Sequence, residues 1–416
     1  MNSERHSALA PFGIKSFRFQ WTADLATSWA FEMEALILGW FILVETGSVT
    51  LLALYGALQY CGSLISPLFG VAGDRIGHRK VFFMTRLVYV LLAATYCVLA
   101  FTHALTPLYA LILAGICGLM RPSDMLLRNA LIAQTVPAEQ LTGALGISRL
   151  TYDSAKVAGA LSGVGMFAVF GMGWAYAMVL VMYAISWCLT FGIAGQQPHM
   201  TGARAEPESV WVELSESFTY AWANPVILGC IFFAFLVNIF AYPFFLGLLP
   251  YVAKNIFGLD QAGYGLLSAS FSFGGLLGSV ILALNRFNLG TARSVIVASA
   301  AWFVLIFIYA NATSLVWVHL LLIGSGFFQS ICLIPVASIM IRETEAKFWG
   351  RMMGIRMLAI WGLPAGLLLS GPLINTIGFR ATAMLYPAAG IVLTLLMVWH
   401  WRDALWAKNA NANIHR

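Results

Sequence analysis

The chain has 416 residues, of which 60% are hydrophobic and only 10% are charged, and its formal net charge is +6 at pH 7. Soluble domains carry roughly 25% charged residues, so this composition excludes a water-soluble protein of this length. The basic residues are dispersed between apolar segments, which argues against a nucleic-acid partner. The chain is therefore predicted to be an all-α integral membrane protein.

Twelve apolar stretches are long enough to cross a membrane, because a helical span needs about 20 residues. The first, fourth and fifth of them contain charged residues, which makes them the weakest. The polar residues 1–19 lack the apolar core of a cleaved signal peptide, so the first span is expected to be retained. The predicted spans are 17–44, 51–69, 81–101, 107–133, 146–169, 174–193, 226–252, 263–284, 294–309, 316–341, 354–377 and 381–401.

The distribution of lysine and arginine predicts the orientation. If the N-terminus is cytoplasmic, the outward connections hold only Lys254 and Arg380 of the 23 basic residues that the chain contains. Cytoplasmic loops are enriched in such residues. Both termini are therefore predicted to lie in the cytoplasm, at an inner membrane of the bacterial type.

A polar stretch over 195–225 divides the chain into a six-span half at 1–194 and a second half at 226–416. The sequence G-A-L-S-G at 159–163, in span 5, has a counterpart in G-L-P-A-G at 362–366, in span 11. A duplicated six-helix unit would place such similar segments in corresponding spans. We therefore expect two six-helix bundles joined by a cytoplasmic loop.

The connection between spans 2 and 3 reads G-V-A-G-D-R-I-G-H-R-K over residues 70–80. A charged, glycine-rich segment cannot lie in hydrocarbon, so it is expected to form a tight turn at the cytoplasmic face. This loop resembles the G-x-x-x-D-R-x-G-R-R/K signature of the major facilitator superfamily, from which only His78 departs. The resemblance covers essentially the whole chain. It implies the twelve-helix, two-bundle fold, alternating-access transport of a small molecule, and no cofactor.

A narrower resemblance concerns the siderophore and drug exporters of that superfamily. It rests on R-N-A-L-I-A-Q-T-V-P-A-E-Q-L at 128–141 and on the small residues of the span that follows. The antiporter motif of these proteins reads roughly G-P-x-x-G, whereas 159–163 here lacks the proline. The resemblance implies export, and the missing proline weakens the inference of antiport from this motif.

The signature loop is interpreted as a latch that holds the cytoplasmic side closed. Asp74 can face the positive N-terminal end of a neighbouring helix, which in the family is span 11. The alternative is a loop whose charges only set the topology. The latch residues are Gly70, Asp74, Arg75, Gly77, Arg79 and Lys80.

Span 1 carries three acidic residues, of which Asp24 is near the cytoplasmic end and Glu32 and Glu34 are near the middle. An acidic residue at mid-membrane depth costs about 2.5–3.5 kcal/mol on insertion scales, so it needs a partner or a proton. Glu32 and Glu34 point about 200° apart on a helix. One of them is expected to face the cavity and the other a helix contact.

Arg121 in span 4 is the natural partner for these acids. We expect it to tune proton binding by Glu32 or Glu34 as the cavity opens to alternate sides, with Asp24 as a further candidate. The alternative is a static ion network that fixes helix packing. A structural network is predicted for the remaining charged residues of spans 4 and 5, namely Asp124, Arg128, Arg149, Asp153 and Lys156.

The second half has no acidic residue in mid-span, and its polar mid-span residues are surrounded by aromatic ones. Pro243 is expected to break span 7, and broken helices tend to line cavities. Such a wall suits a bulky aromatic substrate, although any single aromatic residue can instead face lipid. The candidates are Asn238, Tyr242, Gln329 and Trp361, with Gln59 and Tyr60 in span 2.

The sequence therefore predicts a monomeric exporter of a hydrophobic or aromatic compound, such as a drug or a siderophore, driven by proton antiport. The alternative of the same fold is a lysophospholipid flippase or a facilitator. A membrane enzyme is disfavoured, because no nucleophile–base pair, metal-ligand spacing or phosphate-binding loop occurs. A non-transporting sensor is disfavoured as well, because no soluble output domain is evident. The expected partners are the substrate, protons and the lipid bilayer.

The latch interpretation predicts that Asp74→Asn reduces transport while membrane insertion stays near normal. The substitution removes the charge that would hold the helix end, but it leaves the apolar spans intact. Transport assays and membrane fractionation check the two parts. Normal transport by well-inserted Asp74→Asn protein would remove the latch hypothesis.

Overall fold

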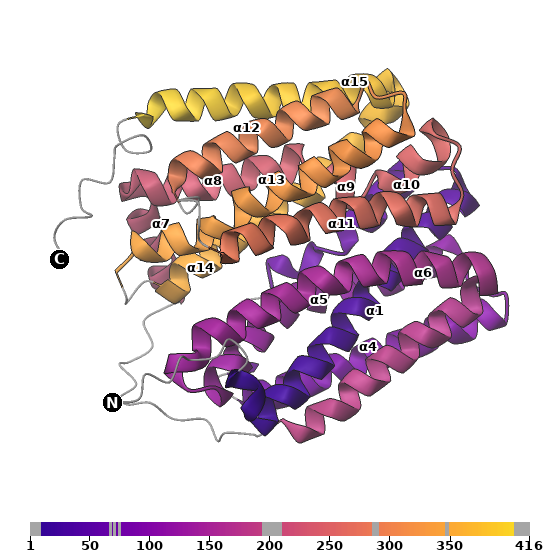
Figure 1. Ribbon diagram of the computed structural model, residues 1–416, viewed down its shortest axis with the longest axis horizontal. Coiled ribbons are helices and arrows are strands. Elements are labelled where there is room, and N and C mark those ends of the chain that lie inside the picture. The colour runs from indigo at the N-terminus through magenta and orange to yellow at the C-terminus, as the bar shows by residue number, and fades with distance from the viewer. Residues whose placement is uncertain are drawn as a thin grey trace. The chain divides into compact units, whose positions relative to one another are not determined.

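The computed structural model describes residues 10–65, 69, 72–73, 76–193, 210–284, 291–345 and 349–402, and these form helices without any strand. Figure 1 labels most of these helices. In chain order they are η1 Ala10–Gly13, α1 Lys15–Thr46, α2 Val49–Leu58, η2 Cys61–Ser63, α4 His78–Phe101, α5 Pro107–Thr135, α6 Ala138–Leu189, η3 Thr190–Gly192, α7 Val210–Ala223, α8 Pro225–Phe240, α9 Pro243–Leu246, α10 Leu249–Tyr251, η4 Val252–Ile256, α11 Gln261–Ala283, α12 Ala292–Tyr309, α13 Leu315–Arg342, α14 Trp349–Leu358, η6 Ala359–Trp361 and α15 Gly362–His400.

Several helices begin at residues that satisfy their first backbone N–H groups. Thr106 accepts a hydrogen bond from the backbone of Tyr109 at the start of α5, and Asn224 accepts from two backbone N–H groups at the start of α8. Both helices carry proline at the first position, where the missing N–H costs nothing. Thr291 forms a capping box with Ser294 at the start of α12. These local signals fix where the spans start.

Two long helices each contain two spans. A straight helix of the 52 residues of α6 would be about 78 Å long at 1.5 Å per residue, against a hydrocarbon core of about 30 Å. The chain reverses at Gly171 in α6 (φ 78°) and at Gly378 in α15 (φ 83°), conformations that favour glycine. The described residues contain eight helices long and apolar enough to cross a membrane. The doubled helices and two interrupted spans bring this arrangement to the twelve predicted spans.

Spans 2 and 7 are interrupted. The helix α2 ends at Leu58, and a 3₁₀ turn, η2, follows after Gln59 and Tyr60. The helix α8 ends at Phe240, and short pieces from Pro243 onwards complete that span. The predicted break at Pro243 is confirmed. Both interruptions place polar side chains where the backbone leaves regular helix.

The described residues belong to two compact units. The first takes its residues from Met1–Thr201 and Leu246–Phe273, and the second from Gly202–Phe245 and Gly274–Arg416. Within the first unit, α1 packs against α5 and α6, and α4 packs against both as well (Figure 1). Within the second, α8 packs against α12, α13 and α15. The division of the sequence at 195–225 remains a prediction, and residues 195–209 lie outside the described residues.

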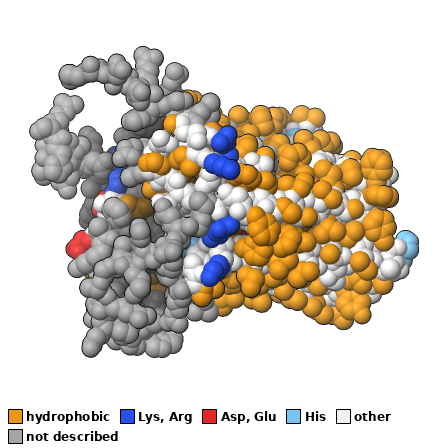
Figure 2. Space-filling model, turned by 90° about the horizontal axis from the view of Figure 1, so that it is seen from below, with side chains coloured by type: hydrophobic (Ala, Val, Ile, Leu, Met, Phe, Trp, Pro, Cys, Tyr) orange, Lys and Arg blue, Asp and Glu red, His pale blue; other side chains and the backbone are white. Residues whose placement is uncertain are grey.

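Hydrophobic side chains cover much of the outer surface. Figure 2 shows one face of the molecule on which they dominate, with lysine and arginine side chains along one edge of the hydrophobic area. Val169 is 74% exposed and Trp174 is 60% exposed. Soluble monomers rarely expose apolar patches larger than a few hundred Å². This surface fits the predicted all-α membrane fold, in which lipid covers the apolar residues.

Glycine allows α1 and α6 to approach closely. A methyl group at Gly163 would lie 2.7 Å from the Cα atom of Met33, whereas a methyl group at Gly165 would meet nothing within 4 Å. Contacts below 3 Å force the neighbouring backbone to move, and overpacking costs typically about 1–3 kcal/mol. The interior of the first unit therefore depends on Gly163.

Gly163→Ala is expected to lower the thermal unfolding temperature of the purified protein, and Gly165→Ala is its matched control. Both changes favour the helix equally by removing a flexible residue, by up to about 1 kcal/mol. Only the first introduces a collision with α1. Equal unfolding temperatures for the two variants would contradict the inference of close packing at Gly163.

Candidate functional site

The three acidic residues of α1 lie in three different environments within the first unit. Asp24 and Glu34 are buried, whereas Glu32 is half-buried. Successive residues of a helix are rotated by about 100°, so residues two apart point in different directions. Each acid is therefore considered with its own neighbours.

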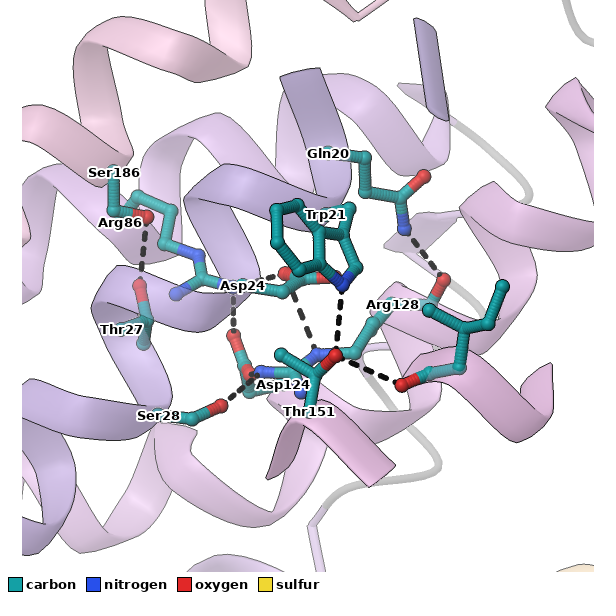
Figure 3. Close-up of polar contacts among 11 residues, drawn as sticks. Gln20, Trp21, Asp24, Thr27, Ser28, Arg86, Asp124, Arg128, Thr151 and Ser186 are labelled. Atoms are coloured by element: carbon teal, nitrogen blue, oxygen red, sulfur yellow. Dashed lines mark hydrogen bonds and ion pairs between the residues drawn. The ribbon is translucent and has the colours of Figure 1, made fainter. Parts of the chain in front are cut away.

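Asp24 belongs to a buried group of four charged side chains, which we call the ion quartet (Figure 3). It consists of Asp24 from α1, Arg86 from α4, and Asp124 and Arg128 from α5. Arg86 lies 2.9 Å from Asp24 and 3.1 Å from Asp124, measured between the guanidinium nitrogen and the carboxylate oxygen. Arg128 lies 3.3 Å from Asp24 and 3.1 Å from Asp124. Two positive and two negative charges balance each other in this interior.

Neutral side chains hold the ion quartet in place. Arg128 donates a hydrogen bond to Ser28, and its backbone carbonyl accepts one from Gln20 (Figure 3). The indole N–H of Trp21 donates to Thr151 over 2.7 Å, which ties α1 to α6. Buried charges are costly unless they are paired and hydrogen-bonded. The ion quartet therefore joins α1, α4 and α5 into one framework. The proposed coupling role of Asp24 remains a prediction.

Arg86 was missed by the sequence analysis, although it lies inside predicted span 81–101. It is only 1% exposed, and its guanidinium lies 4.4 Å from the ring centroid of Phe82. A charged residue inside a span is itself a signal of a structural or functional site. Its partners on other helices could not be identified without knowing how the helices are rotated.

Glu34 accepts a hydrogen bond of 2.7 Å from the hydroxyl of Tyr183 on α6. It also lines a small cavity together with Arg121 and Gln59, and Arg121 donates a hydrogen bond to the Gln59 side chain. The Arg121 guanidinium lies 4.7 Å from the ring centroid of Phe31. The remaining lining residues are Tyr55, Ala114, Cys117 and Gly118. The structure thus brings three predicted candidates together. Glu34 and Arg121 are candidates for proton coupling, and Gln59 is a candidate for the substrate cavity.

Glu32 forms no hydrogen bond or ion pair with the residues that the structure describes. Its Cβ atom lies against Gly159 of α6, where an added methyl group would approach within 2.6 Å. The positive charges of Lys156 and Arg121 are close enough to act on the carboxylate of Glu32. The hydroxyl of Tyr60 also lies near this carboxylate. Glu32 is therefore the mid-span carboxylate without a direct partner among those described.

The charged residues of α6 that are predicted to form a structural network have contacts along their own helix. Arg149 contacts Asp153 at 3.1 Å, one turn further along the helix. The ammonium group of Lys156 lies 4.6 Å from the ring centroid of Tyr152, a cation–π contact. Arg149 and Lys156 therefore each contact a neighbour on their own helix.

The candidates of the second unit form a neutral polar group beside aromatic rings. Gln329 on α13 donates a hydrogen bond of 2.7 Å to the hydroxyl of Tyr242, whose ring meets Trp302 edge-on with centroids 5.1 Å apart. Asn238 donates to the carbonyl of Ala234 over 2.7 Å. The indole N–H of Trp361 is buried without a hydrogen-bond partner among the described residues. The structure brings Tyr242 and Gln329 into direct contact.

Only part of the predicted latch can be described. Gly77 has φ 96°, which favours glycine, and Arg79 donates a hydrogen bond of 2.9 Å to the carbonyl of Phe191. Lys80 is exposed. Gly70, Asp74 and Arg75 lie outside the described residues, so the latch stays a prediction. Among described residues, no group of His, Cys, Asp and Glu side chains could hold a metal ion.

Comparisons with known proteins agree with this architecture. The family model of the Major Facilitator Superfamily matches residues 23–288. The fold is similar to a POT family transporter, PepTSo (TM-score 0.74, 11% identity, 94% of this chain and 99% of that chain). It is also similar to the nucleoside transporter NupG (TM-score 0.69, 12% identity, 92% of this chain and 99% of that chain). A third similar structure is that of the human organic anion transporter MFSD10 (TM-score 0.64, 13% identity, 92% of this chain and 99% of that chain). No curated protein matches the chain in sequence.

The ion quartet predicts a compensating effect between Asp24 and Arg86. Either Asp24→Asn or Arg86→Gln leaves the ion quartet with one uncompensated buried charge, which costs about 3–5 kcal/mol. The double variant restores charge balance, so its unfolding temperature is expected to exceed that of Arg86→Gln. A double-mutant cycle of thermal unfolding measures this coupling. Additive losses would show that the two charges do not stabilise each other.

Proposed function

The chain belongs to the Major Facilitator Superfamily, and we propose that it exports a small hydrophobic or aromatic compound in exchange for protons. The family and the solved structures of similar fold are those of transporters rather than enzymes. A drug or a siderophore fits the proposed substrate. Export is supported by the resemblance of residues 128–141 to the exporter branch, and exchange for protons by the acidic residues of α1.

One observation carries the proposal, namely the environment of Glu32. Glu34 has the hydroxyl of Tyr183 as a direct partner, whereas Glu32 has none among the described residues. An unpaired carboxylate at this depth is costly until a proton or a substrate group neutralises it. Glu32 is therefore the group that we assign to proton exchange.

Arg121 and Lys156 supply the positive charges that act on Glu32. Binding or release of a proton by Glu32 changes how its side chain interacts with these two cations. A carboxylate that holds a proton in one orientation of the cavity and releases it in the other couples transport to the proton gradient. Arg121, held by Gln59 and Phe31, is the fixed part of this arrangement.

The cellular setting completes the proposal. The positive-inside asymmetry supports an inner membrane of the bacterial type, with both termini and residues 195–225 on the cytoplasmic side. The ion quartet lies toward the N-terminal end of α1 and Glu32 lies further along the helix. In this orientation, Glu32 would be deeper in the membrane than the ion quartet. We propose that the monomer is the transporting unit.

The proposal predicts different outcomes for Glu32→Gln and Glu34→Gln. Glu32→Gln should abolish substrate-triggered proton release from inside-out vesicles with an acidic interior, because glutamine cannot carry the proton. Glu34→Gln is the matched control, since its amide oxygen can still accept the hydrogen bond from Tyr183. The measurement uses a pH-sensitive dye and a panel of aromatic cations and catecholates.

Proton release by Glu32→Gln protein at the wild-type rate would overturn the assignment. Substrate or lipid movement without any proton flux in the wild type would favour a facilitator or a lysophospholipid flippase of the same fold. Both outcomes require that the variants insert into the membrane as the wild type does. Immunoblots of the vesicles establish this.

A further inference from the structure

The first and second units repeat one packing arrangement. A methyl group at Gly159 would lie 2.6 Å from the Cβ atom of Glu32 and 3.0 Å from the carbonyl oxygen of Trp29. At Gly362 it would lie 3.1 Å from the Cβ atom of Asn238 and 2.7 Å from the carbonyl oxygen of Phe235. In both cases, the residue with the nearby carbonyl oxygen stands three positions before the residue with the nearby Cβ atom. Asn238 on α8 is therefore the counterpart of Glu32 on α1.

A second correspondence joins α5 and α13. Arg121 and Gln329 stand the same number of residues after the N-cap residues of their helices, Thr106 and Ser314. The side chains of Arg121 and Gln329 also both lie against the second predicted span of their own half of the sequence. Arg121 binds Gln59, while a methyl group at Gly275 would lie 3.4 Å from Oε1 of Gln329. The charged pair of the first unit thus corresponds to two amides in the second.

The two amides have unused hydrogen-bond acceptors. Asn238 and Gln329 are each only 6% exposed. Their N–H groups donate to the carbonyl of Ala234 and to the hydroxyl of Tyr242, and their side-chain oxygens accept no hydrogen bond from a described residue. These oxygens can therefore accept a hydrogen bond from a bound molecule. Glycine at position 275 leaves room beside one of these oxygens.

We propose that Asn238 and Gln329 form a subsite that accepts hydrogen bonds from uncharged phenolic or catecholic hydroxyl groups of the substrate. This inference rests on the proposed transport function and names the substrate chemistry that the second unit recognises. The hydroxyl groups supply the donors that the two amide oxygens lack. The ring that carries them packs among the aromatic side chains of this unit.

The surroundings favour an uncharged aromatic donor over an ammonium group. The helices α8, α11, α12, α13 and α15 contain no aspartate or glutamate that could balance a positive charge. Trp302 lies edge-on to Tyr242 and stacks on Phe245 with centroids 6.1 Å apart. Aromatic rings attract one another in such arrangements. A hydroxylated aromatic ring meets both requirements.

The test compares two probes with the same aromatic ring system, of which only one can donate hydrogen bonds. These are 2,3-dihydroxynaphthalene and its dimethyl ether, whose equilibrium binding to the purified protein in nanodiscs is measured by tryptophan fluorescence. The wild type should bind the diol about tenfold more tightly than the ether, because only the diol can donate hydrogen bonds to the two amide oxygens. Gln329→Met should remove most of this preference by weakening diol binding alone.

A second variant leaves the amides in place. Gly275→Ala puts a methyl group beside Oε1 of Gln329 at ordinary contact distance, so it should block the acceptor without a collision. It is expected to reduce the preference for the diol, as Gln329→Met does. Ser299→Ala, which removes only a hydrogen bond within α12, is the control and should retain the preference.

The outcomes separate the subsite from the proposed proton exchange. Glu32→Gln should abolish proton release and yet keep the preference for the diol, since the subsite belongs to the second unit. Equal binding of diol and ether by the wild type, or binding of neither, would overturn the subsite. The same conclusion follows if the preference survives in both Gln329→Met and Gly275→Ala.

Discussion

The structure of the first unit depends on the cost of placing charge in hydrocarbon. Four charged residues are buried in the ion quartet, and each carboxylate there contacts two guanidinium groups. Such a group is stable only while it stays complete, because removing one member leaves a buried charge unpaired. It fixes α1, α4 and α5 to one another. This framework holds α1 in place, and α1 carries Glu32 and Glu34.

The cost of burying charge also applies to Glu32 and Glu34, which lie on one helix but have different neighbours. Glu34 points toward Tyr183 and a small cavity, and Glu32 points toward Gly159 and the charges of α6. Glycine at 159 and 163 lets α1 approach α6 closely enough for this contact. A larger residue at either position would collide with α1 and displace the carboxylate. The glycines of this span therefore position a charged group as well as pack two helices.

The sequence predicted the spans well because hydropathy is a local property of each segment. It also identified Glu32, Glu34 and Arg121, since charged residues inside apolar stretches are conspicuous. It did not identify the partners of Asp24 or the contact between Glu34 and Tyr183, because these depend on helix rotation. Uniformly apolar spans carry little periodic signal, so rotation is set by packing at residues such as Gly163. The similarity of 159–163 to 362–366 was visible in the sequence, but the partners of these glycines, Glu32 and Asn238, were not.

The two units share one packing arrangement, but the residues at corresponding positions differ in their chemistry. Glu32 and Arg121 in the first unit are replaced by Asn238 and Gln329 in the second, so ionisable groups give way to amides. Side-chain amides do not change their charge in the physiological pH range, and they both accept and donate hydrogen bonds. In the proposed mechanism, proton exchange is confined to one unit, so the charge state would change at Glu32 while the amide oxygens keep the same affinity for a substrate hydroxyl. A duplicated fold can in this way separate energy coupling from substrate recognition without a change of architecture.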